Sequence, residues 1–172
     1  HGVEVYPSIR RALHAGGADL GVDAVLLIGE HGDYPWKERG RHMYPRRHFF
    51  EQIAGVFAES GRSVPVYNDK HFAYDFQDAA WMWKRAKELE IPLMAGSSLP
   101  LAWRNPWVEY RKGVSIDEAL SIGYSNAIEA YGYHAIELLL CMVERRKGGE
   151  SGISSVRCIQ GDDVWVACEK GV

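Results

Sequence analysis

The chain has 172 residues, of which 47% are hydrophobic and 25% charged, and its formal net charge is −3. This composition is ordinary for a globular protein, and the slight negative charge excludes a general electrostatic attraction to nucleic acid or to an anionic membrane. No apolar run reaches the roughly 20 residues of a membrane-spanning helix, and the start lacks the pattern of a signal peptide. Three scattered cysteines are too few for a disulfide framework and favour a reduced, cytoplasmic protein.

Residues 1–100 alternate predicted helices and strands in the order that builds a parallel sheet. The apolar run 23–28, bounded by Gly21 and Gly29, is typical of a strand that is covered on both faces. The strand–helix–strand spacing then repeats, which indicates right-handed crossovers. The expected elements are a short helix over 9–15, strands over 23–28, 64–67 and 92–95, helices over 49–59 and 75–89, and a polar loop over 30–46.

The pattern changes after Pro100, where the signals become more irregular. The expected elements are an aromatic connector over 103–107, a strand over 118–124, a helix over 133–146, and a hairpin of strands over 155–159 and 164–167. The long helix is favoured by the basic residues that precede Gly148. The sequence therefore predicts an α/β fold, with a partial Rossmann-like parallel sheet and flanking helices over residues 1–100 and a small α+β segment over 101–172.

Polar side chains follow the first two predicted strands of the sheet. Ligands of open parallel sheets collect beyond the carboxyl ends of the strands, and consecutive strands usually lie side by side. We therefore expect His31, Asp33, Asp69, Lys70 and His71 to lie close together. The two histidines and two carboxylates could hold a divalent metal or act as general acid and base, and the lysine could stabilise an anion. The alternative is that these residues cap helices, close turns or face solvent.

His134 and Glu137 form a second candidate pair in the last long helix. Three residues apart, they face the same side of the helix, so the carboxylate could orient the imidazole for proton transfer. A purely structural histidine at the start of a helix is the alternative. Ser97 and Ser98 also follow a strand, but no G-x-S-x-G sequence surrounds them, which argues against a nucleophile elbow.

Several of these stretches together resemble one known family. The stretch 22–28 (VDAVLLI) resembles the fourth Rossmann strand of its members, 64–71 (VPVYNDKH) the fifth strand, and 86–96 (AKELEIPLMAG) the sixth. The stretch 130–137 (AYGYHAIE) is similar to the later family signature Asp-x-x-x-His-x-x-Asp. On these motifs, the chain resembles the Gfo/Idh/MocA family, named for glucose–fructose oxidoreductase and inositol dehydrogenase.

The resemblance implies an oxidoreductase that acts on a carbohydrate or polyol with NAD(P) as cofactor. The residues that it implies are Lys70, His134 and Glu137 as catalytic groups and Glu30, Asn68 and Asp69 as cofactor contacts.

The chain also departs from the family pattern. Asp69 and His71 stand where the family has the Glu and Pro of Glu-Lys-Pro, and Ala130 replaces the first acid of the later signature. No G-x-G-x-x-G loop, which would hold the pyrophosphate of a dinucleotide, is present. With His1 as its first residue, the chain is expected to be a fragment, a processed product or a trimmed chain, and residues 1–100 are expected to be the second half of a Rossmann-like domain. The resulting open sheet edge would favour a homodimer.

Three functions are consistent with these patterns. The first is the Gfo/Idh/MocA-like oxidoreductase, with a small-molecule substrate. The alternative is a metal-assisted hydrolase of a small ester or lactone, in which a metal held by His31, Asp33, Asp69 and His71 activates water. A non-catalytic dimerisation or binding module is the second alternative.

Overall fold

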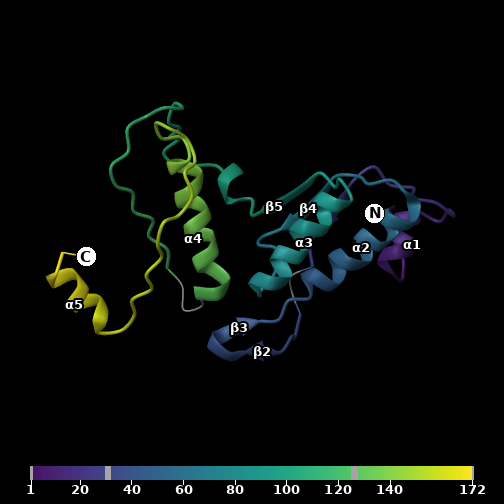
Figure 1. The fold of residues 1–172 in the computed structure, drawn as a ribbon, viewed down its shortest axis with the longest axis horizontal. Helices are drawn as coiled ribbons and strands as arrows, with labels where there is room; N and C mark the ends of the chain where they lie inside the picture. The colour runs from purple at the N-terminus through teal and green to yellow at the C-terminus, as the bar shows by residue number, and fades with distance from the viewer. Residues whose placement is uncertain (1, 30–31, 125–127, 172) are drawn as a thin grey trace.

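The computed structural model describes residues 2–29, 32–124 and 128–171 (Figure 1). Its centre is a three-stranded parallel sheet in the order β1-β4-β5, formed by β1 (Val25–Leu27), β4 (Val66–Asp69) and β5 (Leu93–Gly96). In the pairing register, Leu26 lies beside Tyr67 and Tyr67 beside Met94. The three strands lie within or next to the ranges expected from the sequence. The fold class is therefore α/β with a parallel sheet and flanking helices, as predicted.

Helices α1 (Ile9–His14), α2 (Arg46–Ser60) and α3 (Phe76–Glu88) form one layer over this sheet. Local signals fix their ends: the Ser8 side chain accepts a hydrogen bond from the Arg11 amide, and Asp75 accepts one from the Gln77 amide. The helix α2 ends at Gly61, whose φ of 60° lies in the left-handed region. Because α2 packs against α1, α3 and β1, the helices share one side of the sheet.

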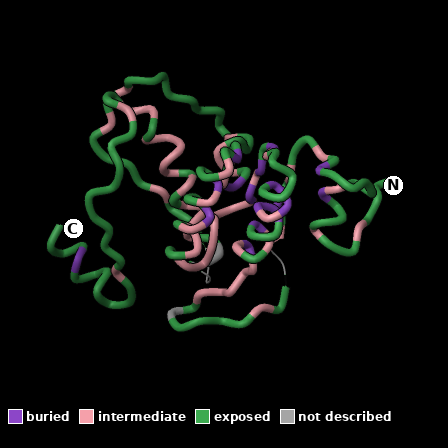
Figure 2. Tube along the Cα trace, turned by 45° about the vertical axis from the view of Figure 1, so that its right-hand side comes forward, coloured by how far each residue is buried: buried purple, intermediate pink, exposed green. Residues whose placement is uncertain are grey.

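The hydrophobic core lies between this helical layer and the sheet. Phe50 and Phe57 of α2, Met82 of α3 and Val66 of β4 are almost completely buried there. Every described residue that is buried lies between Leu13 and Ser97, apart from Ala167. Figure 2 shows the same division, with buried positions gathered in the sheet and its helices and exposed positions along the C-terminal part.

The opposite face of the sheet is largely open. Leu26, Ile28 and Met94 point to this face and are 69%, 62% and 61% exposed, whereas their neighbour Leu27 is buried against the helices. The first strand was predicted to be covered on both faces, which is wrong for Leu26 and Ile28. The strands follow one another across the sheet in chain order, and both crossovers are right-handed. The two connecting helices therefore lie on the same face of the sheet, and they do not cover the other face.

The segment that was expected to be a polar loop contains a small antiparallel hairpin. Its strands are β2 (Trp36–Lys37) and β3 (Arg41–His42), joined by the short 3-10 helix η1 (Glu38–Gly40). The hairpin is attached to the start of α3, because Arg41 forms an ion pair with Asp75 at 3.2 Å. The loop prediction missed this element because two-residue strands are too short to produce a recognisable alternation.

The part after β5 is helical and irregular. It contains the 3-10 helix η2 (Leu99–Leu101), the long helix α4 (Ile128–Val143) and the short helix α5 (Asp163–Glu169). The strand expected over 118–124 is absent, and so are both strands of the hairpin expected over 155–167. In place of the second strand, α5 begins at Asp163, whose carboxylate suits the positive end of the helix dipole. Within the described ranges, no helix is long and apolar enough to cross a membrane.

Candidate functional site

The carboxyl end of β4 forms a sharp turn that is tied to β5. The Lys70 amide donates a hydrogen bond to the Gly96 carbonyl oxygen at 2.9 Å, and the Tyr67 hydroxyl donates to the same oxygen. Lys70 has a φ of 66°, a left-handed conformation that costs a non-glycine residue on the order of 1–3 kcal/mol. Such strain persists only where neighbouring contacts enforce it, and here the pairing with Gly96 does so. The turn thereby fixes the positions of Asp69 and His71 on either side of Lys70.

Helix α4 is fastened to this edge of the sheet through Glu137. Its two carboxylate oxygens accept hydrogen bonds from the Ser97 amide at 3.0 and 2.9 Å, and the Ser97 hydroxyl donates a further one. The Tyr133 hydroxyl, one turn earlier in the helix, donates to the same carboxylate at 2.9 Å. Hydrogen bonds to an ionised carboxylate are among the stronger ones in proteins. This group, which we call the Glu137 anchor, joins two segments that lie 40 residues apart in the sequence.

The anchor corrects the expected role of Glu137. The sequence suggested that this carboxylate orients His134, but its hydrogen bonds come from Ser97 and Tyr133. The Nδ1 atom of His134 is buried without a hydrogen-bond partner among the described residues. His134 and Glu137 lie on the same side of the helix because of their spacing. The Glu137 carboxylate, however, is hydrogen-bonded to Ser97 at the end of β5. Glu137 is therefore a positioning residue rather than a partner of the imidazole.

The anchor also requires a glycine at position 96. A Cβ atom added there would lie 2.8 Å from a carboxylate oxygen of Glu137, closer than van der Waals contact permits. Gly96 also has a φ of 156°, which residues with side chains rarely adopt. The helix can approach the strand this closely only because Gly96 has no side chain.

Two tyrosines from different elements line the anchor. The pKa of Tyr133 is raised well above its ordinary value, first by burial and then by its hydrogen bond to Glu137 and the negative charge of that group. The pKa of Tyr67 is raised by burial and by the charges of Asp69 and Glu137. Both hydroxyls therefore remain protonated hydrogen-bond donors over the physiological range. The positive charge of the buried Arg46 of α2 acts in the opposite direction and lowers the pKa of Tyr133.

Some of the predicted site residues meet at this edge. Asp69, Lys70 and His71 follow one another at the end of β4, and the His71 ring lies 5.3 Å from the Tyr133 ring. The Tyr133 ring in turn lies 5.9 Å from the ring of His134. As the topology predicted, Lys70 and His71 lie at the carboxyl end of β4, and α4 places His134 beside Tyr133.

Other predicted residues do not take part in the way expected. Asn68 is completely buried, and its side-chain amide donates to the His71 carbonyl oxygen at 3.0 Å, so it shapes the turn. Asp33 is exposed. No group of three or more His, Cys, Asp or Glu side chains that could hold a metal ion occurs in the part of the chain that the structure describes. Glu30 and His31 lie outside the described residues.

Four members of the site were not predicted as such from the sequence, namely Tyr67, Ser97, Tyr133 and Arg46. Ser97 was considered only as a nucleophile, whereas it serves as a donor to the anchor. One signal was available for Tyr133, because a residue four positions before Glu137 must lie beside it on a helix. No such spacing pointed to the buried Arg46, because it is distant in sequence from the other members of the site.

Two hollows flank the N-terminal half of α4. One of about 470 Å³ is lined by His71 and Tyr133, and another of about 440 Å³ by His134. They share Ile128 and Gly132 in their walls. The His71 and His134 side chains therefore reach two adjoining spaces at the same end of the helix.

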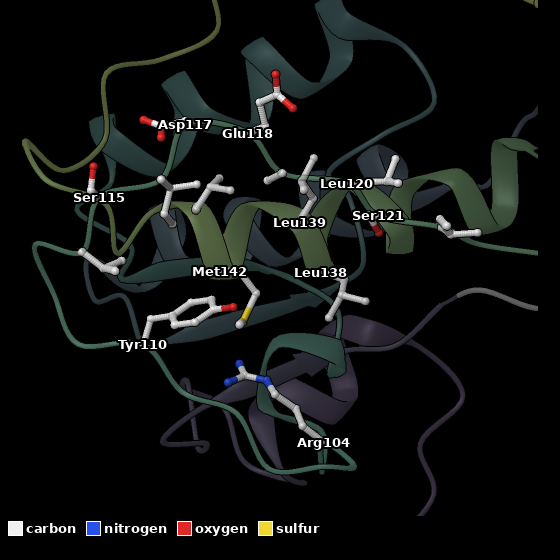
Figure 3. A pocket seen from close by; sticks show the side chains of 15 residues that line it. Arg104, Tyr110, Ser115, Asp117, Glu118, Leu120, Ser121, Leu138, Leu139 and Met142 are labelled. Carbon is white, nitrogen blue, oxygen red and sulfur yellow. The ribbon is translucent and has the colours of Figure 1, made fainter. Parts of the chain in front are cut away.

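A larger hollow of about 780 Å³ lies along the C-terminal half of α4 and contains none of the site residues. In Figure 3, Leu138 and Met142 of the helix are directed toward Arg104 and Tyr110.

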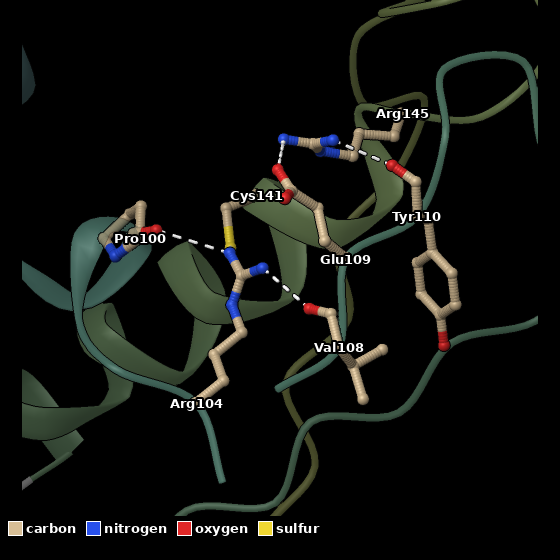
Figure 4. A network of polar contacts seen from close by, with 7 residues as sticks. All are labelled: Pro100, Arg104, Val108, Glu109, Tyr110, Cys141 and Arg145. Carbon is tan, nitrogen blue, oxygen red and sulfur yellow. Dashed lines mark hydrogen bonds and ion pairs between the residues drawn. The ribbon is translucent and has the colours of Figure 1, made fainter. Parts of the chain in front are cut away.

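The connector that forms this wall is held to the helix by the polar contacts in Figure 4. Arg145, just after the end of α4, donates to the Tyr110 carbonyl oxygen at 2.7 Å and contacts Glu109 at 2.6 Å. This hollow is a space between the connector and α4, separate from the Glu137 anchor.

Comparison of the chain with protein-family models, with curated proteins and with solved structures finds no match.

The Glu137 anchor predicts opposite effects for two glycine substitutions. Gly96→Ala should lower the free energy of unfolding by about 1–3 kcal/mol, because the methyl group displaces a carboxylate that satisfies several donors. Gly55→Ala, in the middle of α2 with open space around its Cβ position, should raise it by about 0.5–1 kcal/mol. Urea unfolding followed by circular dichroism measures both. Equal effects of the two substitutions would show that α4 does not rest on Gly96.

Proposed function

We propose that this edge of the sheet is the proton-transfer side of a Gfo/Idh/MocA-like oxidoreductase that acts on a hydroxyl group of a carbohydrate or polyol. The observation that carries the proposal is the Glu137 anchor, which joins the His134 helix to the strand end next to Lys70. The sequence alone did not connect Lys70 with the pair of His134 and Glu137. A contact that links them at one edge is what a shared reaction centre would need.

Each residue has a role that follows from its surroundings. The Lys70 ammonium, on a turn whose backbone is fixed, would stabilise the negative charge that develops on the substrate oxygen. His134, half-buried beside Tyr133, would accept the hydroxyl proton as a general base. Glu137 would act indirectly, because it holds the helix that carries His134. The three cysteines, which are free thiols, support the expected cytoplasmic setting of such an activity.

The cofactor that the family resemblance implies does not fit these residues by themselves. The sequence contains no G-x-G-x-x-G loop to hold a pyrophosphate, and Asn68, an expected contact, is completely buried. The proposal is therefore limited to binding of the substrate hydroxyl and transfer of its proton.

Ligand-induced thermal stabilisation tests this proposal. A ligand at about 100 times its Kd stabilises a protein by about 2.7 kcal/mol, which is a rise of about 5–11 °C in Tm for a chain of this size. We expect such a rise with glucosides or polyols, and we expect Lys70→Ala to reduce it. The matched control is Lys84→Ala, an exposed lysine in α3. NAD(H), NADP(H) and divalent metals with and without chelator complete the panel.

The outcomes separate the candidate functions. A rise with sugar or polyol that Lys70→Ala weakens and Lys84→Ala leaves unchanged supports the proposal. A rise with a metal alone, removed by chelator and by His71→Ala, would contradict it in favour of the metal-assisted hydrolase. No rise with any of these ligands would also contradict it and would favour a binding module.

We propose homodimerisation as a second function, because the open face of the sheet favours it. Leu26, Ile28 and Met94 expose a row of apolar side chains, and apolar surface of this kind is stabilised when it is removed from water. Beside them, β1 is an edge strand of the described sheet. A second copy, related by a two-fold axis, could cover both features.

The dimer is tested by light scattering after gel filtration. The chain should elute with twice the mass of one copy, and Met94→Glu should convert it to the mass of one, because a carboxylate would have to be buried in the contact. Leu101→Glu, at an exposed position outside the sheet, should leave the mass unchanged. A single-copy mass for the unsubstituted chain at about 100 µM, a concentration at which weak dimers with micromolar Kd associate, would contradict the proposal.

A further inference from the structure

The β2–β3 hairpin carries a stack of aromatic rings. The indole of Trp36 and the imidazole of His42 lie face to face, with ring centroids 4.2 Å apart and planes inclined by only 6°. The His42 ring is also 4.3 Å from the Tyr44 ring, and Tyr34 lies 5.9 Å from both His42 and Tyr44. Two-residue strands are too short to hold a hairpin by backbone bonds alone. The side chains therefore stabilise it.

The stack is held rigidly. Trp36 and His42 are directly opposite each other across the strand pair. The Nε2 atom of His42 donates to the Tyr34 carbonyl oxygen at 2.9 Å, which fixes the plane of the imidazole. The hairpin as a whole is fixed at its base by the Arg41–Asp75 ion pair and by Lys37, whose ammonium lies 5.3 Å from the centre of the Tyr74 ring. The indole is thus presented in one orientation.

One face of Trp36 meets solvent. The residue is 63% exposed although its other face is covered by His42. Trp103 and Trp165 are also exposed, but neither contacts another aromatic ring within the described ranges. Trp36 therefore differs from them in being a fixed aromatic plane with an accessible surface, which is the arrangement expected of a binding surface rather than of core packing.

The stack leads inward from this surface to Arg46 of α2. Tyr44, at the inner end of the stack, lies 4.7 Å from the guanidinium of Arg46, which is 2% exposed. The charge of Arg46 acts on Tyr133, which belongs to the Glu137 anchor. Figure 1 shows the hairpin projecting below the start of α3, to which the Arg41–Asp75 ion pair attaches it. The hairpin follows β1 in the chain and β1 runs parallel to β4, so the open indole projects from the same edge of the sheet as Lys70.

An open indole face suits the flat face of a sugar ring. A pyranose ring presents a flat face of C–H groups that covers an aromatic plane, while its hydroxyl groups remain free for hydrogen bonds. Burial of this apolar area contributes favourably, at about 25 cal/mol per Å². Glu38, exposed two residues after Trp36, can accept hydrogen bonds from the hydroxyl groups. An acyclic polyol has no such flat face.

We propose that Trp36 is the stacking platform of a sugar subsite, and that the substrate is a carbohydrate in its pyranose ring form rather than an acyclic polyol. This inference rests on the proposed function, since it extends the same edge of the sheet outward to the hairpin. A ring stacked on Trp36 would belong to a substrate whose reacting hydroxyl points toward Lys70.

Titration followed by NMR tests this subsite. The indole N–H signal of Trp36 reports ligand binding directly, with methyl β-glucopyranoside as the ring-form probe and sorbitol as the acyclic probe. We expect the glucoside to shift this signal in the unsubstituted chain. The backbone amide signals of the hairpin, which persist in the variants, should show about tenfold weaker binding to Trp36→Ala. Trp36→Phe, which keeps an aromatic face, should bind within about threefold of the unsubstituted chain. Trp165→Ala, at a distant exposed tryptophan, should bind the glucoside normally.

Several outcomes would overturn the subsite. Equal glucoside affinity in Trp36→Ala and Trp165→Ala would do so while leaving the proposed function intact, as would a sorbitol affinity equal to that of the glucoside. A change of oligomeric mass in Trp36→Ala, without a change in glucoside affinity, would mean that the hairpin contacts protein instead. Failure of the proposed function is seen separately, as a saccharide or polyol response that does not depend on Lys70. A circular dichroism spectrum and Tm equal to those of the unsubstituted chain confirm that the substituted chain is folded.

Discussion

The carboxylate of Glu137 is the contact on which the arrangement of the molecule depends. It satisfies the Ser97 amide, the Ser97 hydroxyl and the Tyr133 hydroxyl at once. Hydrogen bonds to a charged group contribute about 1.5–3 kcal/mol each, which is a large share of the stability of a small domain. Without this contact, η2 would be the main remaining attachment of α4 to the sheet region. The position of His134 relative to Lys70 is therefore set by a residue that need not touch a substrate.

The two parts of the chain differ in how they are stabilised. Residues up to Ser97 form a core in which α2 packs on the sheet and against α1 and α3, so burial holds this part together. The part that follows has few buried residues and many exposed apolar ones, such as Trp103 and Ile122. It is held by polar contacts, including the Glu137 anchor and the Arg145 bonds to the connector. Apolar surface on this scale is usually covered by a partner or by other protein, which agrees with the proposed second copy.

The sequence predicted those features that depend on local patterns. The strands of the parallel sheet and the helices between them follow from apolar runs and capping residues such as Ser8 and Asp75, and they are confirmed. The placement of Lys70 and His71 at a sheet edge follows from the topology and is confirmed as well. Helix α4 was expected to begin at Tyr133, but it starts at Ile128, because Gly132 does not interrupt it.

Features that depend on contacts distant in sequence could not be predicted. On its own helix, Glu137 could bond to Tyr133 or to His134. Its hydrogen bonds with Ser97 at the end of β5 depend on the tertiary fold. The role of Gly96 likewise exists only once α4 lies against it. In the C-terminal part, the alternation at 118–124 resembles a strand, but a strand needs a partner to pair with, and none lies beside it in the described ranges. The aromatic stack on the hairpin was missed because Trp36 and His42 meet only across its turn.

A double-mutant cycle between Ser97→Ala and Glu137→Gln tests the Glu137 anchor most directly. The free energy of unfolding is measured by urea denaturation for the unsubstituted chain, for both single variants and for the double variant. The anchor predicts that the two effects are not additive, with a coupling of about 1–2 kcal/mol, because each substitution removes part of the same contact. Effects that add to within about 0.3–0.5 kcal/mol would contradict it, since residues that do not interact behave in that way.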